Sequence, residues 1–282
     1  MATCSIPPKQ AKCDSKMEPN WLELPIDITS NILQRLSTTE IVTIACHLCP
    51  LWWKICKDPL MWRTVHITNP RNATYNHEEK QKICHFAVKR SCGHLEDINI
   101  AYFATDDLLD SIAENANIRC LRLVRCLNIS NKGFSEAVRK LPRLEELDIS
   151  YSNLSNSLDV IGRSCPLLKS FKFAGGFEFQ RHFSAEVSFV IAKTMKELRH
   201  LDIQGSKLSN DGLLSILDKC RLLESLNIRG CSNIDFTGSL RKRCIEQIRS
   251  VQSPRFNDED YTSEDNDSDF DVLFVDSDED GY

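Results

Sequence analysis

The sequence contains no long hydrophobic run, little glycine and little proline. Its 282 residues include only 10 glycines and 10 prolines, which excludes collagen-like and low-complexity chains. No apolar stretch approaches the roughly 18 to 20 residues that a membrane-spanning helix needs. The lysines near the start, Lys9, Lys12 and Lys16, have no apolar stretch behind them, so we do not expect a secretory signal.

Motifs of common enzymes are also missing. The sequence has no Gly-x-x-x-x-Gly-Lys phosphate loop, no Gly-x-Gly-x-x-Gly fingerprint and no Gly-x-Ser-x-Gly elbow. A Cys–His nucleophile pair stays open, because sequence alone does not show which side chains meet in space. We therefore expect a protein that is not an enzyme and needs no cofactor.

Cysteine is abundant, with 13 residues, an odd number. Without an export signal, this count indicates free thiols in a reducing compartment, the cytoplasm, the nucleus or both. Cys46 and Cys49 form one Cys-x-x-Cys with His47 between them, a spacing compatible with zinc. No second pair stands at a matching distance, so small buried thiols on a helix are the favoured interpretation.

Charge is distributed unevenly along the chain. The formal net charge is −5, but 12 acidic and no basic residues lie between Asp258 and Tyr282. The rest of the chain holds 28 acidic against 35 basic residues, a net charge of +7. We expect residues 253–282 to be disordered. Two roles stay open for this acidic segment: screening of the basic body, or addition of Val272–Val275 as a strand to a partner's sheet.

The N-terminal part has two sections. Residues 1–20 show no periodicity, and we interpret them as a disordered leader. From residue 21 the pattern predicts three short helices, the first starting at Pro25, the second at a capping box from Ser37 to Glu40, and the third at Pro50. The second has an apolar stripe of Ile41, Ile44, Ala45 and Leu48. Such a small unit buries little surface, so it needs a partner or the next domain to complete its core.

A repeat of the form apolar-x-x-apolar-x-apolar follows the helices. Its first positions are separated by 23, 26, 24, 30 and 25 residues, which matches the ~20–29-residue period of leucine-rich repeats in all but one step. Each repeat predicts a short strand whose apolar side chains stack on the next repeat. The six members are Leu95/Ile98/Ile100, Ile118/Leu121/Leu123, Leu144/Leu147/Ile149, Leu168/Phe171/Phe173, Leu198/Leu201/Ile203 and Leu223/Leu226/Ile228, with Trp62/Val65/Ile67 as a plausible earlier one.

Helical returns are expected between the strands. Small residues occupy the slot three positions after the last apolar residue, where the backbone must turn away, at Cys126, Ser152, Ser206 and Cys231. The predicted returns are 133–141, 158–164, 185–195 and 212–220. Arg241–Arg243 fits the basic end of a final helix with Leu240, Cys244, Ile245 and Ile248 inward. The expected fold is α/β: a short three-helix unit over 21–64, a small repeat solenoid with a capping helix over 65–252, and the acidic segment.

Residues 21–64 resemble an F-box, on the matches Leu24-Pro25, Ile28, Ile32-Leu33, Leu36, Leu48-Cys49, Trp52, Asp58-Pro59 and Trp62. The repeats resemble the cysteine-containing leucine-rich repeats of F-box/LRR proteins, on 129–134 and 208–213. Asn20–Pro25, Cys56–Pro59 and Met61-Trp62 are similar to a plant subgroup of these proteins. Trp53 stands where a basic residue is usual, and Leu48 where valine is usual.

The resemblance implies a substrate receptor of an SCF-type ubiquitin ligase. The F-box would dock on a Skp-family adaptor held by a cullin, and the repeats would hold a target protein. The implied adaptor-contact residues are Leu24, Pro25, Ile28, Leu33, Leu36 and Trp52. For each of them, a place in the core of the small unit is the alternative. The rival function is a repeat scaffold that acts outside any ubiquitin ligase and uses the helices as an N-terminal cap.

One row of outward strand residues is the candidate target surface. It consists of Asn99, Arg122, Asp148, Lys172, Asp202 and Asn227. The signs are mixed, whereas a nucleic-acid reader would show a one-sided basic stripe, so we expect a protein partner and neither nucleic acid nor membrane. A merely solvated strand face is the alternative. The long fourth step, 174–183, holds Phe177, Phe179 and Phe183, and is either a target-contacting loop or a cap over the core.

Overall fold

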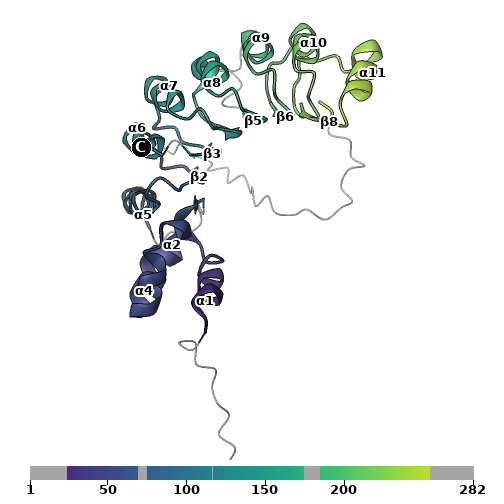
Figure 1. The fold of residues 1–282 in the computed structure, drawn as a ribbon. Coiled ribbons are helices and arrows are strands. Elements are labelled where there is room, and N and C mark those ends of the chain that lie inside the picture. The colour runs from purple at the N-terminus through teal and green to yellow at the C-terminus, as the bar shows by residue number, and fades with distance from the viewer. Residues whose placement is uncertain (1–23, 69–74, 116, 175–184, 255–282) are drawn as a thin grey trace, which may run out of the picture.

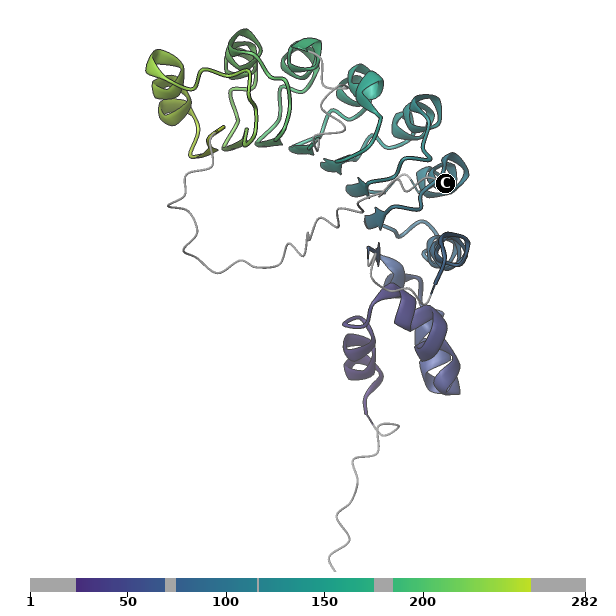
Figure 2. The same cartoon turned by 180° about the vertical axis from the view of Figure 1, so that it is seen from behind.

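The chain forms a curved array of parallel strands and helices with a small helical unit at one end (Figures 1 and 2). The structure, a computed structural model, describes residues 24–68, 75–115, 117–174 and 185–254. The predictions about the leader (1–20), the aromatic insertion and most of the acidic segment, including Val272–Val275, lie outside the described residues.

The N-terminal helical unit, residues 24–62, is named the box segment. Helix α1 (Ile26–Leu33) follows Pro25. The predicted capping box is present: Ser37 Oγ accepts from Glu40 N, and the Glu40 carboxylate accepts from Ser37 N at 2.9 Å. It starts a continuous helical stretch of α2 (Thr38–Glu40), the π-turn η2 (Ile41–Ala45) and α3 (Cys46–Leu48). Helix α4 (Pro50–Cys56) and the 3₁₀ turn η3 (Pro59–Trp62) complete the segment.

The repeats build one parallel sheet in which every strand pairs with the next in sequence order. All six predicted repeats supply strands, and the earlier member over Trp62–Ile67 supplies β1. The last strand, β8, was not predicted. The strands are β1 (Thr64–Ile67), β2 (Asp97–Ala101), β3 (Cys120–Val124), β4 (Glu146–Asp148), β5 (Ser170–Lys172), β6 (His200–Asp202), β7 (Ser225–Asn227) and β8 (Ser250–Gln252).

Helices line the outer side of the arc and strands its inner side (Figure 1). The predicted returns appear as α7, α8, α9 and α10, whereas α5 and α6 were not predicted. The turn η4 (Ser155–Ser157) precedes α8. The helices are α5 (His77–Arg90), α6 (Asp106–Ala113), α7 (Asn131–Arg139), α8 (Leu158–Ser164), α9 (Ala185–Thr194), α10 (Asn210–Lys219) and α11 (Gly238–Gln247).

One prediction about α11 is wrong. Leu240, Cys244 and Ile248 are buried as expected, but Ile245 is 57% exposed. Residues four apart share a helix face, whereas Ile245 lies 100° around the axis from Cys244 and therefore points away from the sheet.

Three of the four predicted small residues, Cys126, Ser152 and Cys231, link their repeat to the one before it. Cys126 Sγ lies 3.7 Å from the Ile100 carbonyl, Ser152 Oγ 3.3 Å from the Leu123 carbonyl, and Cys231 Sγ 3.4 Å from the Ile203 carbonyl. Each acceptor is the last apolar residue of the preceding repeat. Burial raises the pKa of Cys126 to about 11, which keeps this thiol protonated and able to donate. The slot therefore selects a small side chain that is also a hydrogen-bond donor.

We expect Gly162→Ala in α8 to destabilise the solenoid. Alanine in place of glycine within a helix normally gains about 1 kcal/mol, but a Cβ at Gly162 would overlap Thr194 at the end of α9. Overpacking of this kind costs about 1–3 kcal/mol. Chemical denaturation measures the change. Lys193→Ala on exposed α9 surface is the control and should change stability by less than about 0.5 kcal/mol. A Gly162→Ala variant as stable as wild type would contradict the packing described.

Candidate functional site

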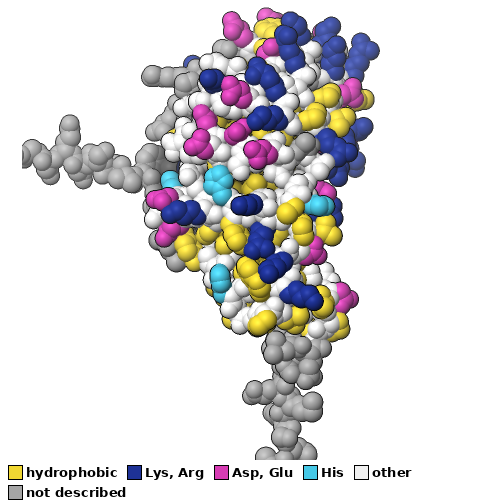
Figure 3. Space-filling model, turned by 60° about the vertical axis from the view of Figure 1, so that its left-hand side comes forward, with side chains coloured by type: hydrophobic (Ala, Val, Ile, Leu, Met, Phe, Trp, Pro, Cys, Tyr) yellow, Lys and Arg dark blue, Asp and Glu magenta, His cyan; other side chains and the backbone are white. Residues whose placement is uncertain are grey.

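The box segment carries much of the exposed apolar surface of the described chain. Ten large hydrophobic side chains are exposed among the described residues, and five of them lie in this short segment. The space-filling view shows hydrophobic side chains gathered on the lower part of the molecule (Figure 3), where Figure 1 places the box segment. The five are Ile26, Ile28, Ile44, Leu48 and Leu60. An apolar concentration of this kind is typical of a protein-docking surface.

The predicted adaptor residues do not all lie on that surface. Pro25 and Ile28 are exposed, and Leu24, Leu36 and Trp52 are half-buried. Leu33 is wrong as a contact residue, because its side chain is fully buried in the core. It lies at the end of α1, where the apolar face of the helix packs on the rest of the segment. Ile44 and Leu48, two members of the apolar stripe predicted for the second helix, are 55% and 60% exposed.

An aromatic cluster joins the box segment to the first repeat. Trp62 is buried, donates from Nε1 to the Cys56 carbonyl at 2.9 Å, and meets Phe86 of α5 edge-on at 5.9 Å between centroids. The Arg90 guanidinium lies 4.9 Å from the Trp53 ring and 5.1 Å from the Phe86 ring. His66 N of β1 donates to Thr38 Oγ1 at 3.0 Å. The box segment is therefore held against the solenoid at both a helix and a strand.

The Cys46–Cys49 pair has structural partners. Cys49 is the N-cap of α4, and its Sγ accepts from Trp52 N at 3.4 Å. Cys46 is buried beside Cys56, and burial raises the pKa of Cys56 to about 12. These contacts assign the two thiols to helix capping and core packing.

A cavity of about 800 Å³ lies where the box segment meets β1. Its walls come from the turn after α1, from η3 and from the first strand, and include Arg35, Leu36, Arg63 and His66. Polar and apolar groups line it together. The predicted adaptor residue Leu36 therefore faces this hollow.

The residues of the predicted target row lie side by side on neighbouring strands. Each member pairs in register with the next across β2 to β7: Asn99, Arg122, Asp148, Lys172, Asp202 and Asn227. His66 and Gln252 extend it at the two ends. All six predicted residues are partly exposed. The alternation of the strands thus brings together side chains that are as much as 128 residues apart in the sequence.

Ion pairs fix one end of the row. Arg122 reaches Asp97 at 2.8 Å and Glu146 at 3.1 Å, and His66 Nε2 lies 3.3 Å from Asp97. Burial opposes ionisation of Asp97, but His66 and Arg122 outweigh it and leave the pKa of Asp97 below its usual value. Asn99 Oδ1 is buried without a hydrogen-bond partner among the described residues.

At the other end of the row the charged side chains are paired less closely. Lys172 lies 4.0 Å from Asp202, and burial raises the pKa of Asp202 even though Lys172 opposes this. The row therefore presents fixed, paired charge near β3 and weakly paired charge near β5 and β6.

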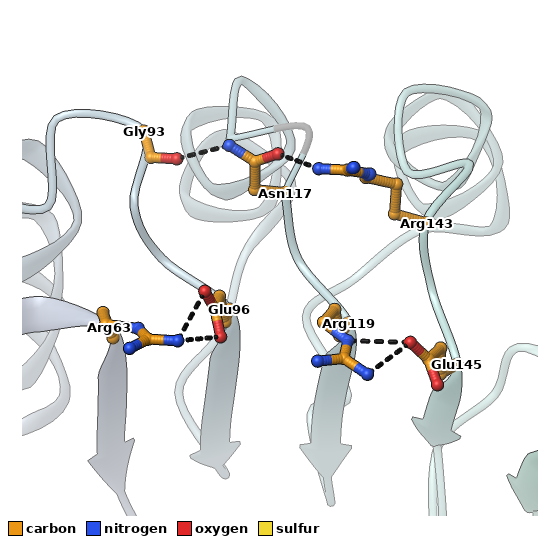
Figure 4. Close-up of polar contacts among 7 residues, drawn as sticks. All are labelled: Arg63, Gly93, Glu96, Asn117, Arg119, Arg143 and Glu145. Atoms are coloured by element: carbon orange, nitrogen blue, oxygen red, sulfur yellow. Dashed lines mark hydrogen bonds and ion pairs between the residues drawn. The ribbon is translucent and has the colours of Figure 1, made fainter.

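A second charged row, which sequence reasoning missed, runs along the start of the strands (Figure 4). Arg63 pairs with Glu96 at 2.8 Å, and Glu145 is bound by both Arg119 and Lys169 at 2.7 Å. Arg199 pairs with Glu224 farther along. Every one of these residues directly follows the first apolar residue of a repeat, so their signs, which alternate from Arg63 to Lys169, were visible in the aligned repeats. Exposed pairs contribute only about 0–1 kcal/mol each, so the row mainly favours correct register.

Comparison with known proteins decides the family. The chain is 42% identical to "F-box protein SKIP19" of Arabidopsis thaliana, an alignment that covers 100% of this chain and 94% of that protein. It is 34% identical to "Putative F-box/LRR-repeat protein 21" of the same plant, over 86% of this chain and 84% of that one. The chain belongs to the plant F-box/LRR-repeat proteins.

Other comparisons of this F-box/LRR-repeat protein are less extensive. "Putative F-box/LRR-repeat protein 23" of Arabidopsis thaliana is 42% identical over 87% of this chain but only 56% of its own length. No family model matches the sequence. Among solved structures, the yeast Rad7 and Elc1 complex matches with a TM-score of 0.44 and 18% identity, covering 71% of this chain and 48% of that one. No helix among the described residues has the length and apolar character needed to cross a bilayer.

Proposed function

We propose that this F-box/LRR-repeat protein is the substrate-recognition subunit of an SCF-type ubiquitin ligase. The box segment would dock on a Skp-family adaptor and, through it, on a cullin. The observation that carries the proposal is the exposed apolar surface of that segment, with Ile44 and Leu48 one helical turn apart. Full burial of one such side chain contributes about 1.5–3 kcal/mol, so a partner that covers several of them gains a stable interface.

The repeats would hold a target protein on the row from Asn99 to Asn227. Mixed and partly paired charges favour a protein of complementary pattern, because mismatched charges are penalised. The chain itself would carry out no bond chemistry. Its contribution is to hold the target near the ubiquitin-carrying subunit in a fixed orientation, and the junction at Trp62 and Arg90 supports that rigidity.

Co-purification tests the proposal. The full chain should retain a purified Skp-family adaptor and, with it, a cullin. Leu24→Asp and Trp52→Ala should each weaken this binding while the far-ultraviolet circular dichroism of the repeats stays unchanged. If wild type retains no Skp-family adaptor, the repeat scaffold acting outside any ubiquitin ligase becomes the better description.

A further inference from the structure

Three side chains stand out at the ends of β2, β3 and β4. Tyr102, Arg125 and Tyr151 each lie three residues after a member of the target row, so they share one register position. All three have left-handed backbone, with φ of 79°, 55° and 57°. Their N–H groups donate to the next repeat, to the carbonyls of Val124, Ser150 and Ala174 at 2.8–3.0 Å. The turn therefore has the same left-handed conformation in these three repeats.

Glycine fills the same position later in the solenoid. Gly205 and Gly230 have φ of 66° and 69°, and their N–H groups donate to the next repeat in the same way. A residue with a Cβ adopts this conformation at a cost that glycine does not have. The repeat therefore folds without a side chain here, and three consecutive repeats nevertheless carry large ones. Strained non-glycine residues of this kind concentrate at functional sites.

The three side chains form a stack. The Arg125 guanidinium lies 5.8 Å from the Tyr102 ring centroid and 5.1 Å from that of Tyr151, between the two rings. Each of the three is partly exposed. The guanidinium lies over both tyrosine rings, and its planar fork of N–H donors is the geometry that matches a carboxylate. The tyrosine rings add an apolar surface on both sides.

We propose that the Tyr102–Arg125–Tyr151 stack is a binding site for an acidic, aromatic-containing peptide, and that the chain's own residues 258–282 occupy it. This segment contains 12 acidic residues, no basic ones, and the aromatic residues Tyr261, Phe270, Phe274 and Tyr282. Occupation in cis would make the segment a competitor of a target at the edge of the target row.

The described chain ends at the same edge of the sheet as the stack, the edge formed by the turns that follow the strands. Gly230 N donates to the Pro254 carbonyl at 3.0 Å, as Arg125 N donates to the Ser150 carbonyl, so Pro254 lies one residue before the register position that Arg125 occupies in its own repeat. Strand β8 is five strands from β3, a path of about 24 Å at ~4.8 Å per strand. About seven extended residues span that path at ~3.3 Å each, so the acidic segment reaches the stack. Tethering supplies an effective concentration of about millimolar.

Hydrogen exchange of the full chain, read by mass spectrometry, tests the proposal. The backbone amides of 258–282 should exchange at least several-fold more slowly in the wild type than in a free peptide of that sequence. Arg125→Gly should restore the free-peptide rate, as should 1 M salt, which screens the attraction. Changing the 12 acidic residues to Asn and Gln should have the same effect as Arg125→Gly.

The variants separate binding from folding. Arg125→Gly places glycine where later repeats have it, so its melting temperature should equal or exceed that of the wild type. Lys207→Ala removes an exposed cation elsewhere on the solenoid and should leave the segment protected. Protection that survives Arg125→Gly would overturn the site. Wild-type amides that exchange at the free-peptide rate would overturn its occupation in cis. Neither readout depends on adaptor binding.

Discussion

Ile44→Asp or Leu48→Asp is expected to abolish binding of the Skp-family adaptor without unfolding the chain. Both side chains are mostly exposed, at 55% and 60%, so a carboxylate there stays hydrated in the free protein. In the complex the same carboxylate would lose its water against an apolar surface, at a cost of several kcal/mol. We expect the dissociation constant to rise about 100-fold or more, which corresponds to about 2.7 kcal/mol.

The chain offers a matched control for this experiment. Ile245 on α11 is 57% exposed and lies at the far end of the solenoid from the box segment (Figure 1). Ile245→Asp makes the same chemical change at the same exposure and should leave adaptor affinity unchanged. Isothermal titration with purified adaptor measures all three variants. Full affinity in both Ile44→Asp and Leu48→Asp would place the adaptor on another surface.

The solenoid could be predicted from the sequence because its period is fixed by packing. Each repeat must bury the same three positions against its neighbour, so the spacing of apolar residues gives the strands and their register. Strand β8 was not predicted because its repeat, Ile248-x-x-Val251-x-Ser253, lacks the third apolar residue. Among the described residues no strand pairs beyond β8, so fewer of its positions must be apolar to bury a neighbour.

The target row was predicted correctly as a set of aligned residues, because side chains alternate across a strand. The box segment was harder. Leu33 and Ile28 belong to one apolar helix pattern, yet one is fully buried and the other is 44% exposed. Apolar periodicity does not distinguish a core contact from a docking contact in a unit that needs both.

The second helix shows a further limit. One apolar stripe was predicted on 3.6-residue spacing, but residues 41–45 form a π-turn, which changes the phase of the side chains. Ile41 and Ala45 remain buried, whereas Ile44 and Leu48 turn outward. Similarly, no local sequence pattern predicted the Tyr102–Arg125–Tyr151 stack. Its members are more than 20 residues apart, and it appears only when the repeats are aligned at the left-handed position.

Trp62→Ala is expected to have the largest effect on stability of any substitution considered. The side chain is 1% exposed, packs on Phe86 of the first repeat and donates to Cys56 O in the box segment. Removal of a buried tryptophan costs about 3–5 kcal/mol, and the resulting cavity lies at the junction of the two units. Urea denaturation followed by circular dichroism measures the loss.

Trp62→Phe separates packing from hydrogen bonding. It keeps an aromatic ring near Phe86 but removes the indole N–H that donates to the Cys56 carbonyl. Loss of this hydrogen bond should cost about 1 kcal/mol, and the loss of packing should be smaller than in Trp62→Ala. Ile245→Ala is the surface control, since Ile245 is 57% exposed on α11, away from the junction, and should cost less than Trp62→Ala. Equal stability of Trp62→Ala and Ile245→Ala would contradict the junction. In that case the box segment would not be rigidly joined to the repeats, and the orientation that the proposed function requires would have to come from another contact.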